Sequence, residues 1–381
     1  MPIVTTHAGS LPRPAELDHL YASRSRGEAV DEARFRELVA AATTSVVREQ
    51  LALGIDVVNN GEAPRESFLT YVRERLSGFD GTTRRPVMAD LTEFPSLVAM
   101  KRAQAAGGQR VSPLRPPACC GPVTYADPLP MQAEVDGFAA ALDAGRRSGI
   151  GWASDTFLTA VSPGLVAAAM DNRHYPDDDG YLDAVAEALG AEYQFIAMSG
   201  HILQIDAPDL AMERHTRFAG RPLDDFLPFV ERVVTGINRA VAGIDPSRIR
   251  LHVCWGNYDG PHNHDIPLAD ILPLLLDAQV GWLVLPFANP RHAHEYRLLS
   301  DLPPTMGVVA GVIETTHNYI EHPQVVADRI DRVLDVVGDA SRVQAGTDCG
   351  FATFAGLGDV ASEVAWEKLR SLVAGAELAG R

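Results

Sequence analysis

Residues 249–254 read Ile-Arg-Leu-His-Val-Cys, an apolar run that ends with an imidazole and a thiol two residues apart. If the run is a β-strand, alternate side chains share a face, so His252 and Cys254 can both reach one small ion. Zn²⁺ is the ion that best suits thiolate and imidazole together. The alternative is a structural role for both residues, because free Cys is often buried in the core and many strand-end histidines are only hydrogen-bonded.

A second separated cysteine follows another short run far downstream. Cys349 lies in Gly-Thr-Asp-Cys-Gly at residues 346–350, after the predicted strand 342–345. Together with His252 and Cys254 it would give zinc three protein ligands and leave one tetrahedral position open, which is typical of catalytic sites. Four cysteines in 381 residues do not make a disulfide framework, and we predict that the adjacent pair, Cys119 and Cys120, lies in the core.

Short apolar runs alternate with helical patterns along the chain. The predicted strands are 3–7, 55–59, 156–161, 202–206, 249–254, 282–287, 307–313 and 342–345. The predicted helices include 32–53, 66–76, 132–148, 181–198, 223–242, 268–278 and 324–337. Eight strands, each followed by a helix, predict an α/β fold of the (β/α)₈ TIM barrel type. A doubly wound open sheet alternates in the same way.

Several predicted strands are followed by polar or reactive side chains. Ser10, Glu62, Asp206, Glu314 and Cys349 all lie at or just beyond such strand ends. In a parallel barrel these ends gather on the C-terminal face, where active sites are built. In an open sheet they would be spread along a line, and the first and last strands could not share a site. A shared site therefore requires the barrel.

Residues 81–130 interrupt the alternation. This segment is rich in Pro, Arg and Gly and is too long for a plain loop between barrel elements. We predict one TIM-barrel domain over residues 1–381, with 81–130 inserted between its second and third strands. A hairpin around 117–125 would belong to this insertion, which would cap the barrel or mediate contacts in a homo-oligomer.

Composition and charge limit the partners. With 46% hydrophobic and 22% charged residues, the chain is typical of a soluble globular protein. Its net charge of −17 disfavours nucleic acid and anionic membranes as partners. The N-terminus lacks a basic region followed by an apolar one, and no uncharged apolar run reaches about 18 residues, so we expect a cytoplasmic protein.

With these strand ends in place, the chain resembles the cobalamin-independent methionine synthase family, specifically its C-terminal catalytic barrel and the shorter single-barrel relatives. The similarity extends over essentially all 381 residues. The matching motifs are His-Ala-Gly-Ser-Leu-Pro at 7–12, Asn-Gly-Glu at 60–62 with Arg65, Gln-Ile-Asp-x-Pro at 204–208, His-Val-Cys at 252–254 and Asp-Cys-Gly at 348–350. Several motifs in the family's order are more specific than any one of them.

The resemblance implies a zinc-dependent S-alkyltransferase, in which Zn²⁺ holds a small thiol such as homocysteine as a thiolate for methyl transfer. Ser10, Glu62 and Asp206 would then bind the amino-acid end of the thiol, with the two carboxylates facing its ammonium group. Helix capping or a surface salt bridge is the alternative role of these residues. The family's usual further ligand, a Glu at the end of the sixth strand, is replaced by Pro286, which leaves water or an unidentified side chain as the fourth ligand.

The epoxyalkane:coenzyme M transferases share this reduced ligand pattern and are the alternative within the resemblance. The alkyl donor stays open between methyl-folate, a methylcobamide and an epoxide. The loop after the seventh strand supplies Glu314 and His317, for which the resemblance implies an acid or donor-contacting role, although His317 could also be a solvated loop residue. Residues 289–295 could form a second metal site by composition, but Pro290 favours a helix start there.

Two hypotheses of other classes also remain open. In the first, a zinc-bound water on the same barrel would act in a hydrolase or lyase. In the second, the barrel would be a zinc-stabilised binding protein or the partner of a methyl carrier, without turnover of its own. Binding of a thiol to the metal would distinguish the transferase from the hydrolase.

Overall fold

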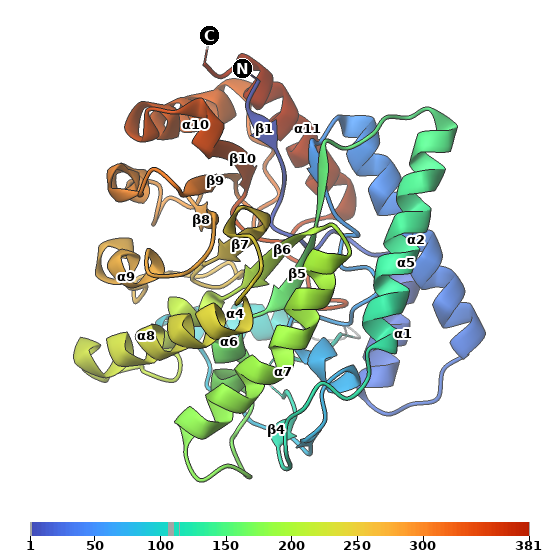
Figure 1. Ribbon diagram of the computed structural model, residues 1–381, viewed down its shortest axis with the longest axis vertical. Helices are drawn as coiled ribbons and strands as arrows, with labels where there is room; N and C mark the ends of the chain where they lie inside the picture. The colour runs from blue at the N-terminus through green and yellow to red at the C-terminus, as the bar shows by residue number, and fades with distance from the viewer. Residues whose placement is uncertain (1, 106–109, 114, 381) are drawn as a thin grey trace.

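The computed structural model describes residues 2–105, 110–113 and 115–380, which form an eight-stranded sheet surrounded by helices (Figure 1). The strands of this sheet are β1 Val4–Thr5, β2 Val57–Val58, β5 Asp155–Val161, β6 Ile202–Asp206, β7 Ile249–His252, β8 Trp282–Pro286, β9 Gly307–Ile313 and β10 Val343–Thr347. Each lies within or overlaps a predicted strand, and neighbouring strands pair in parallel. The predicted TIM-barrel fold class is confirmed.

The order of the strands brings the two ends of the chain together. The sheet runs β1-β10-β9-β8-β7-β6-β5-β2, so β1 and β2 are its edges. Side chains join these edges: the Thr5 amide and hydroxyl donate to the Asp56 carboxylate at 2.8 and 2.9 Å, and the Thr6 hydroxyl donates to the Val57 carbonyl at 3.0 Å. The nearly closed barrel therefore places the residues after β10 near those after β7.

Helices pack around the sheet in the order expected from the sequence. They are α1 Ala15–Ser25, α2 Glu32–Leu53, α5 Leu129–Ser148, α6 Pro163–Ala169, α7 Asp178–Met198, α8 Leu223–Ala240, α9 Leu268–Leu275, α10 Pro323–Val337 and α11 Ser362–Leu378. In α2, the Asp31 side chain caps the first turn and Gly54, at φ 80°, ends the helix. No helix of the described residues is long and apolar enough to cross a bilayer.

In helix α8 the apolar residues of the sequence pattern form the face that packs against the rest of the barrel. Its buried side chains include Phe226, Phe229, Val230, Val233 and Ile237, which are spaced so that they share one face. Burying each such side chain contributes about 1.5–3 kcal/mol. The apolar period therefore both predicts the helix and holds it against the sheet.

The predicted helix 66–76 is wrong for most of its length. Only Thr70–Glu74 is helical, as a 3₁₀ segment. The Ser67 hydroxyl accepts a bond from the Thr70 amide at 2.8 Å, and the Thr70 hydroxyl donates to Glu66 at 2.6 Å. Such local side-chain bonds compete with the regular helical pattern, which explains the difference.

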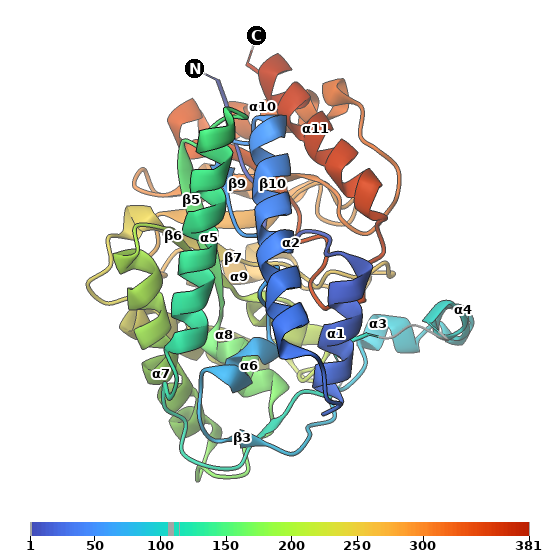
Figure 2. The ribbon, with the colours of Figure 1, turned by 90° about the vertical axis from the view of Figure 1, so that its right-hand side faces the viewer.

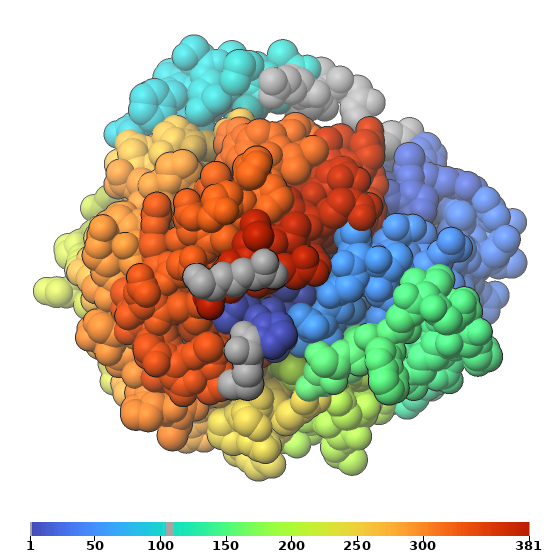
Figure 3. Space-filling view, turned by 90° about the horizontal axis from the view of Figure 1, so that it is seen from above, coloured from blue at the N-terminus to red at the C-terminus, as the bar shows by residue number. Residues whose placement is uncertain are grey.

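The segment between β2 and β5 holds β3 Phe79–Asp80, α3 Ala89–Thr92, α4 Pro95–Ala105 and β4 Ala118–Cys119. Strands β3 and β4 pair antiparallel, at the opposite end of the molecule from the two termini (Figure 2). The partner of β4 thus comes from residues 79–80 and not from within the expected hairpin 117–125. Helices α3 and α4 project from the barrel and form a ridge along one edge (Figures 2 and 3).

The prediction for the adjacent cysteines is half correct. Cys119 is buried, whereas Cys120 is exposed. Because successive side chains of an extended segment point to opposite sides, one of two neighbours turns to solvent when the other is buried.

Candidate metal centre

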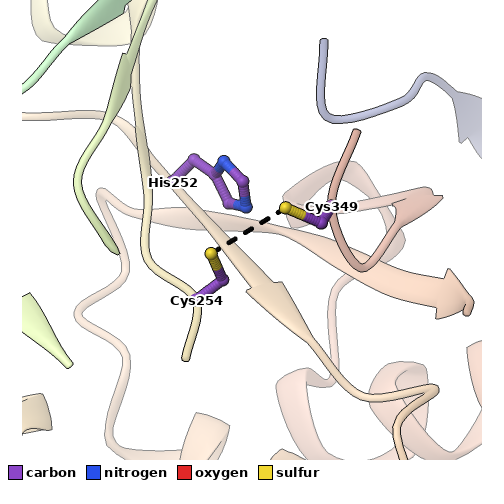
Figure 4. Close-up of side chains that lie close together, drawn as sticks. All are labelled: His252, Cys254 and Cys349. Carbon is purple, nitrogen blue, oxygen red and sulfur yellow. Dashed lines mark hydrogen bonds between the residues drawn. The ribbon is translucent and has the colours of Figure 1, made fainter. Parts of the chain in front are cut away.

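The three predicted metal ligands meet at the C-terminal end of the barrel. His252 is the last residue of β7, Cys254 follows two residues later, and Cys349 lies two residues beyond the end of β10. All three are buried, and one ligand atom of each lies within 4.8 Å of the other two (Figure 4). We call these three residues the sulfur centre.

The spacing of the two thiols suits a metal ion. Their Sγ atoms are 3.9 Å apart. Two sulfurs bound to one tetrahedral ion at about 2.3 Å each would be about 3.8 Å apart. Two thiols and an imidazole are also the donor types that Zn²⁺ prefers. The residues present therefore fit zinc in both chemistry and spacing.

A carboxylate from the neighbouring strand orients the imidazole. His252 Nδ1 lies 2.9 Å from Asp206 Oδ1, which also accepts a bond of 2.9 Å from Gln204 Nε2. Histidine ligands of metals usually donate their other ring N–H to such a carboxylate, which fixes the tautomer. The bond to Asp206 turns Nε2 of His252 away from that carboxylate; Nε2 has a long contact of 3.4 Å with the Asp348 carbonyl oxygen, which a metal ion would replace.

The pKa values of Cys254, Cys349 and His252 shift in different directions, because the three groups interact with one another. The hydrogen bond from the Cys349 thiol lowers the pKa of Cys254 well below its ordinary value, although burial acts in the opposite direction. The same bond, together with burial, raises the pKa of Cys349. Burial alone would lower the pKa of His252, but the Cys254 thiolate and the Asp206 carboxylate raise it well above its usual range. Cys254 therefore ionises more readily than Cys349.

The sulfur centre forms part of the wall of a cavity that opens to solvent. Ser10, Glu62 and Asp206, the three predicted substrate-binding residues, line the same cavity. The rest of its wall is largely apolar and includes Phe68, Pro86, Met88, Pro113, Met212, Phe354 and Leu357, with Arg85, Asn257 and Tyr258 as polar members. Sequence patterns did not indicate these wall residues, because most lie on loops without periodicity.

Glu62 is held in an unusual conformation. Its φ of 54° lies in the left-handed region, which non-glycine residues seldom adopt outside functional sites. Oε1 accepts a bond from the Thr159 hydroxyl at 3.0 Å, while buried Oε2 has no hydrogen-bond partner among the described residues. Burial and the nearby Asp206 raise the pKa of Glu62 to about 7. A carboxylate in this state favours a cationic ligand.

Ser10 lies against the loop that carries Cys349. A Cβ atom on Gly350 would come within 2.1 Å of the Ser10 hydroxyl oxygen, so the close approach needs glycine at this position. The Ser10 hydroxyl accepts a long bond of 3.3 Å from the Ala352 amide. This packing connects the first strand end to the last ligand.

The two residues predicted for the loop after β9 lie differently. Glu314 is buried and lines a smaller cavity together with Cys254, Cys349 and Pro286. Its carboxylate accepts bonds from the amides of Thr316 at 2.8 Å and His317 at 2.9 Å. His317 itself is 52% exposed and lines neither cavity. The structure brings Glu314 near the sulfur centre but leaves His317 outside it.

Asp348 is a site residue whose role the sequence did not indicate. Its carboxylate accepts bonds from the amides of Phe287, Ala288 and Asn289 at 3.1, 2.9 and 2.7 Å. These bonds hold the segment after Pro286 against the loop of Cys349. Only its position next to Cys349 in the sequence pointed to the site.

The fold and the donor set together define a TIM barrel with a candidate thiolate and imidazole metal centre at its C-terminal face. Residues 3–101 match a family model described as the catalytic domain of cobalamin-independent synthase. The methionine synthase of Thermococcus kodakarensis is 26% identical over 383 residues, covering 100% of this chain and 95% of that protein. That of Sulfurisphaera tokodaii is 23% identical, covering 99% and 93%. The predicted resemblance to the cobalamin-independent methionine synthase family is confirmed.

Solved structures agree on the fold. A B12-independent methionine synthase from Shewanella sp. W3-18-1, in complex with selenomethionine, superposes with a TM-score of 0.71 at 20% identity, covering 99% of this chain and 98% of the other. A vitamin-B12 independent methionine synthase, described as putative, from Listeria monocytogenes gives a TM-score of 0.64 at 19% identity, covering 100% and 99%. At these identities the likeness concerns the barrel alone.

Proposed function

We propose that this protein is a zinc-dependent methyltransferase that alkylates a small thiol amino acid, with homocysteine as the first candidate. The observation that carries the proposal is the buried sulfur centre in the wall of an open cavity. The relatives that match along nearly the whole chain are named methionine synthases, which supports the choice of reaction.

His252, Cys254 and Cys349 would hold the zinc ion. When bound, Zn²⁺ lowers the pKa of a substrate thiol and keeps its sulfur as a nucleophilic thiolate at neutral pH. The protein prepares this site in two ways: Asp206 orients the His252 ring, and the hydrogen bond from Cys349 lowers the pKa of Cys254. Pro286, at the position of the family's glutamate, has no side-chain donor, so it leaves room for a sulfur ligand from the substrate.

Glu62 and Asp206 would bind the ammonium group of the substrate. Glu62 Oε2 is buried without a partner, and both described bonds to Asp206 fall on Oδ1, so each carboxylate keeps an oxygen for a cation. The charge of the cavity then distinguishes the two candidate substrates, homocysteine and coenzyme M. Coenzyme M carries an anionic sulfonate and no ammonium group, and two carboxylates in a buried cavity would repel it. The site therefore favours an amino-acid thiol.

The donor would occupy the apolar part of the cavity. Arg85, Pro86, Met88 and Pro113 from the segment 81–130 contribute to this wall, which supports a capping role for the insertion. Glu314 stays a candidate acid near the sulfur centre. For His317 the exposed position gives no support to a catalytic role.

Sulfur binding to the metal tests the proposal. We expect the X-ray absorption spectrum of the zinc-loaded protein to gain one sulfur ligand for each sulfur centre, from two to three, when homocysteine is added. Homoserine, which has a hydroxyl in place of the thiol, should leave the spectrum unchanged. An unchanged spectrum with homocysteine would refute thiol activation and favour hydrolysis by a metal-bound water. Methionine formation should then be assayed with methyl-folate and methylcobamide as alternative donors, and failure with both would refute methyl transfer from these donors.

A further inference from the structure

A second buried cluster lies behind the loop that carries Cys254. Ligand atoms of His262, Asp265 and His292 all lie within 4.8 Å of one another, and these residues are 5%, 8% and 4% exposed. His262 and Asp265 come from the segment between β7 and α9, and His292 comes from the segment after β8. Asp265 Oδ2 is 2.8 Å from His262 Nδ1 and 2.7 Å from His292 Nε2.

The second nitrogen of each imidazole also has a defined acceptor. His292 Nδ1 lies 2.8 Å from Glu295 Oε2, and His262 Nε2 lies 3.1 Å from the Tyr258 carbonyl oxygen. Metal-binding histidines have this arrangement, because a carboxylate or carbonyl on the far side of the ring holds the tautomer whose free nitrogen faces the ion. The cluster thus has its ligand atoms turned inward and its outer hydrogen bonds in place.

A third histidine points at the same carboxylate without bonding to it. His215 is 2% exposed, and neither ring nitrogen has a hydrogen-bond partner among the described residues. Its Nε2 lies 3.6 Å from Asp265 Oδ1, which is also unpartnered, and its Nδ1 lies 3.7 Å from Asp90 Oδ1. These separations are too long for hydrogen bonds. A buried imidazole and a buried carboxylate oxygen therefore face each other here, and neither has a hydrogen-bond partner among the described residues.

We propose that His262, Asp265 and His292 form a second site for a divalent transition-metal ion of the zinc type. Together with His215, which lies beside Asp265, we name these residues the histidine cluster. Two imidazoles and one carboxylate, with a third imidazole beside them and no thiolate, suit Zn²⁺ or Fe²⁺ better than Mg²⁺ or Ca²⁺, which prefer oxygen ligands. Each short contact to Asp265 holds a proton, and the ion would take the place of both protons. The site is distinct from the sulfur centre and does not depend on the proposed function.

The histidine cluster lies between the loop that carries Cys254 and helix α3 of the insertion. The His292 ring stacks on Trp255 with centroids 3.8 Å apart, and Trp255 directly follows Cys254. On the other side, Asp90 of α3 accepts bonds from the Tyr258 hydroxyl at 2.5 Å and from the His262 amide at 3.0 Å. An ion here would fix the loop that carries Cys254 and tie it to the insertion.

The test removes the sulfur centre and looks for a remaining metal ion. A Cys254→Ser, Cys349→Ser double variant should still bind one equivalent of Zn²⁺, and its X-ray absorption spectrum should show nitrogen and oxygen ligands without sulfur. Adding His292→Ala should weaken this binding by about 100-fold or more. The matched control is His294→Ala, two residues away and exposed, which should bind as tightly as the double variant.

Either of two results would overturn the second site. One is a folded double variant that binds no zinc, which would identify the histidine cluster as a set of proton-linked ion pairs. The other is equal zinc affinity with His292→Ala and His294→Ala. The metal content and spectrum of the double variant need no change in the histidine cluster, so they remain decisive if His292→Ala fails to fold, which circular dichroism would show.

Discussion

Replacing Asp206 with Asn should weaken zinc binding without removing any ligand. The carboxylate accepts the His252 Nδ1 bond at 2.9 Å, and the two residues are only 5% and 3% exposed. Asn has the same size and keeps an acceptor oxygen but loses the charge that strengthens this bond. Loss of such a partner behind a ligand histidine typically lowers metal affinity 10–100-fold, which corresponds to about 1.4–2.7 kcal/mol. Because burial limits screening by salt, we expect the upper half of this range.

Competition with a chromophoric chelator at neutral pH would measure the change. The matched control is Asp209→Asn, three residues downstream. Asp209 is fully buried, and burial raises its pKa to about 8, so it is mostly protonated at neutral pH and an amide replaces it with little change of charge. We expect its zinc affinity to stay within about twofold of the wild type, since it does not contact the ligand ring.

Two results would contradict this reasoning. If Asp206→Asn binds zinc as tightly as the wild type, the charge of the Asp206 carboxylate does not contribute to zinc affinity. If Asp209→Asn is weakened equally, the effect is a general loosening of the strand end. Circular dichroism of both variants would establish that each is folded.

Three further predictions follow from charge and burial. The KM for homocysteine should fall as pH rises through about 7, because Glu62 ionises there. Steady-state kinetics of Glu62→Gln should show a higher KM that does not fall over this pH range. The pKa of Asp209 is raised in the folded protein, so the wild type loses stability as pH rises. The advantage of Asp209→Asn in unfolding free energy should therefore grow by about 3 kcal/mol between about pH 5 and pH 7, as measured by urea unfolding. Finally, Pro286→Glu should add a zinc ligand, raise zinc affinity by about tenfold or more in the chelator assay, and weaken homocysteine binding.

The strands could be predicted because each is a short apolar run with a distinct end. The run 249–254 gave both the strand and the ligand spacing, although the strand stops at His252 and Cys254 lies just beyond it. The helix predicted at 66–76 failed because hydrogen bonds of Ser67 and Thr70 override a periodic pattern. Period alone does not reveal such competition between side chain and backbone.

The histidine cluster illustrates what sequence reasoning could not reach. His215, His262 and His292 lie on three different connections of the barrel, His215 at the end of the 3₁₀ segment Met212–His215, and their spacing of 47 and 30 residues has no period. Composition did indicate a metal site within 289–295, but Pro290 favoured a helix start there, and the 3₁₀ segment Glu295–Asp301 does follow. The partners of His292 come from other loops, so only the fold brings them together.

The charges around the sulfur centre give the most specific argument about the substrate. A divalent ion with two thiolates and a neutral imidazole is neutral, and a substrate thiolate makes the assembly anionic. Glu62 and Asp206 add further negative charge in the same cavity, and Glu62 already resists ionisation, with its pKa near 7. An anionic group that no cation on the substrate offsets, such as the sulfonate of coenzyme M, would increase this repulsion. The ammonium group of homocysteine offsets its carboxylate, and placed against Glu62 and Asp206 it relieves the repulsion and helps Glu62 to ionise. A thiol that carries an ammonium group therefore fits the cavity best. Its sulfur can bind at the sulfur centre, and its positive charge offsets the negative charge of Glu62 and Asp206.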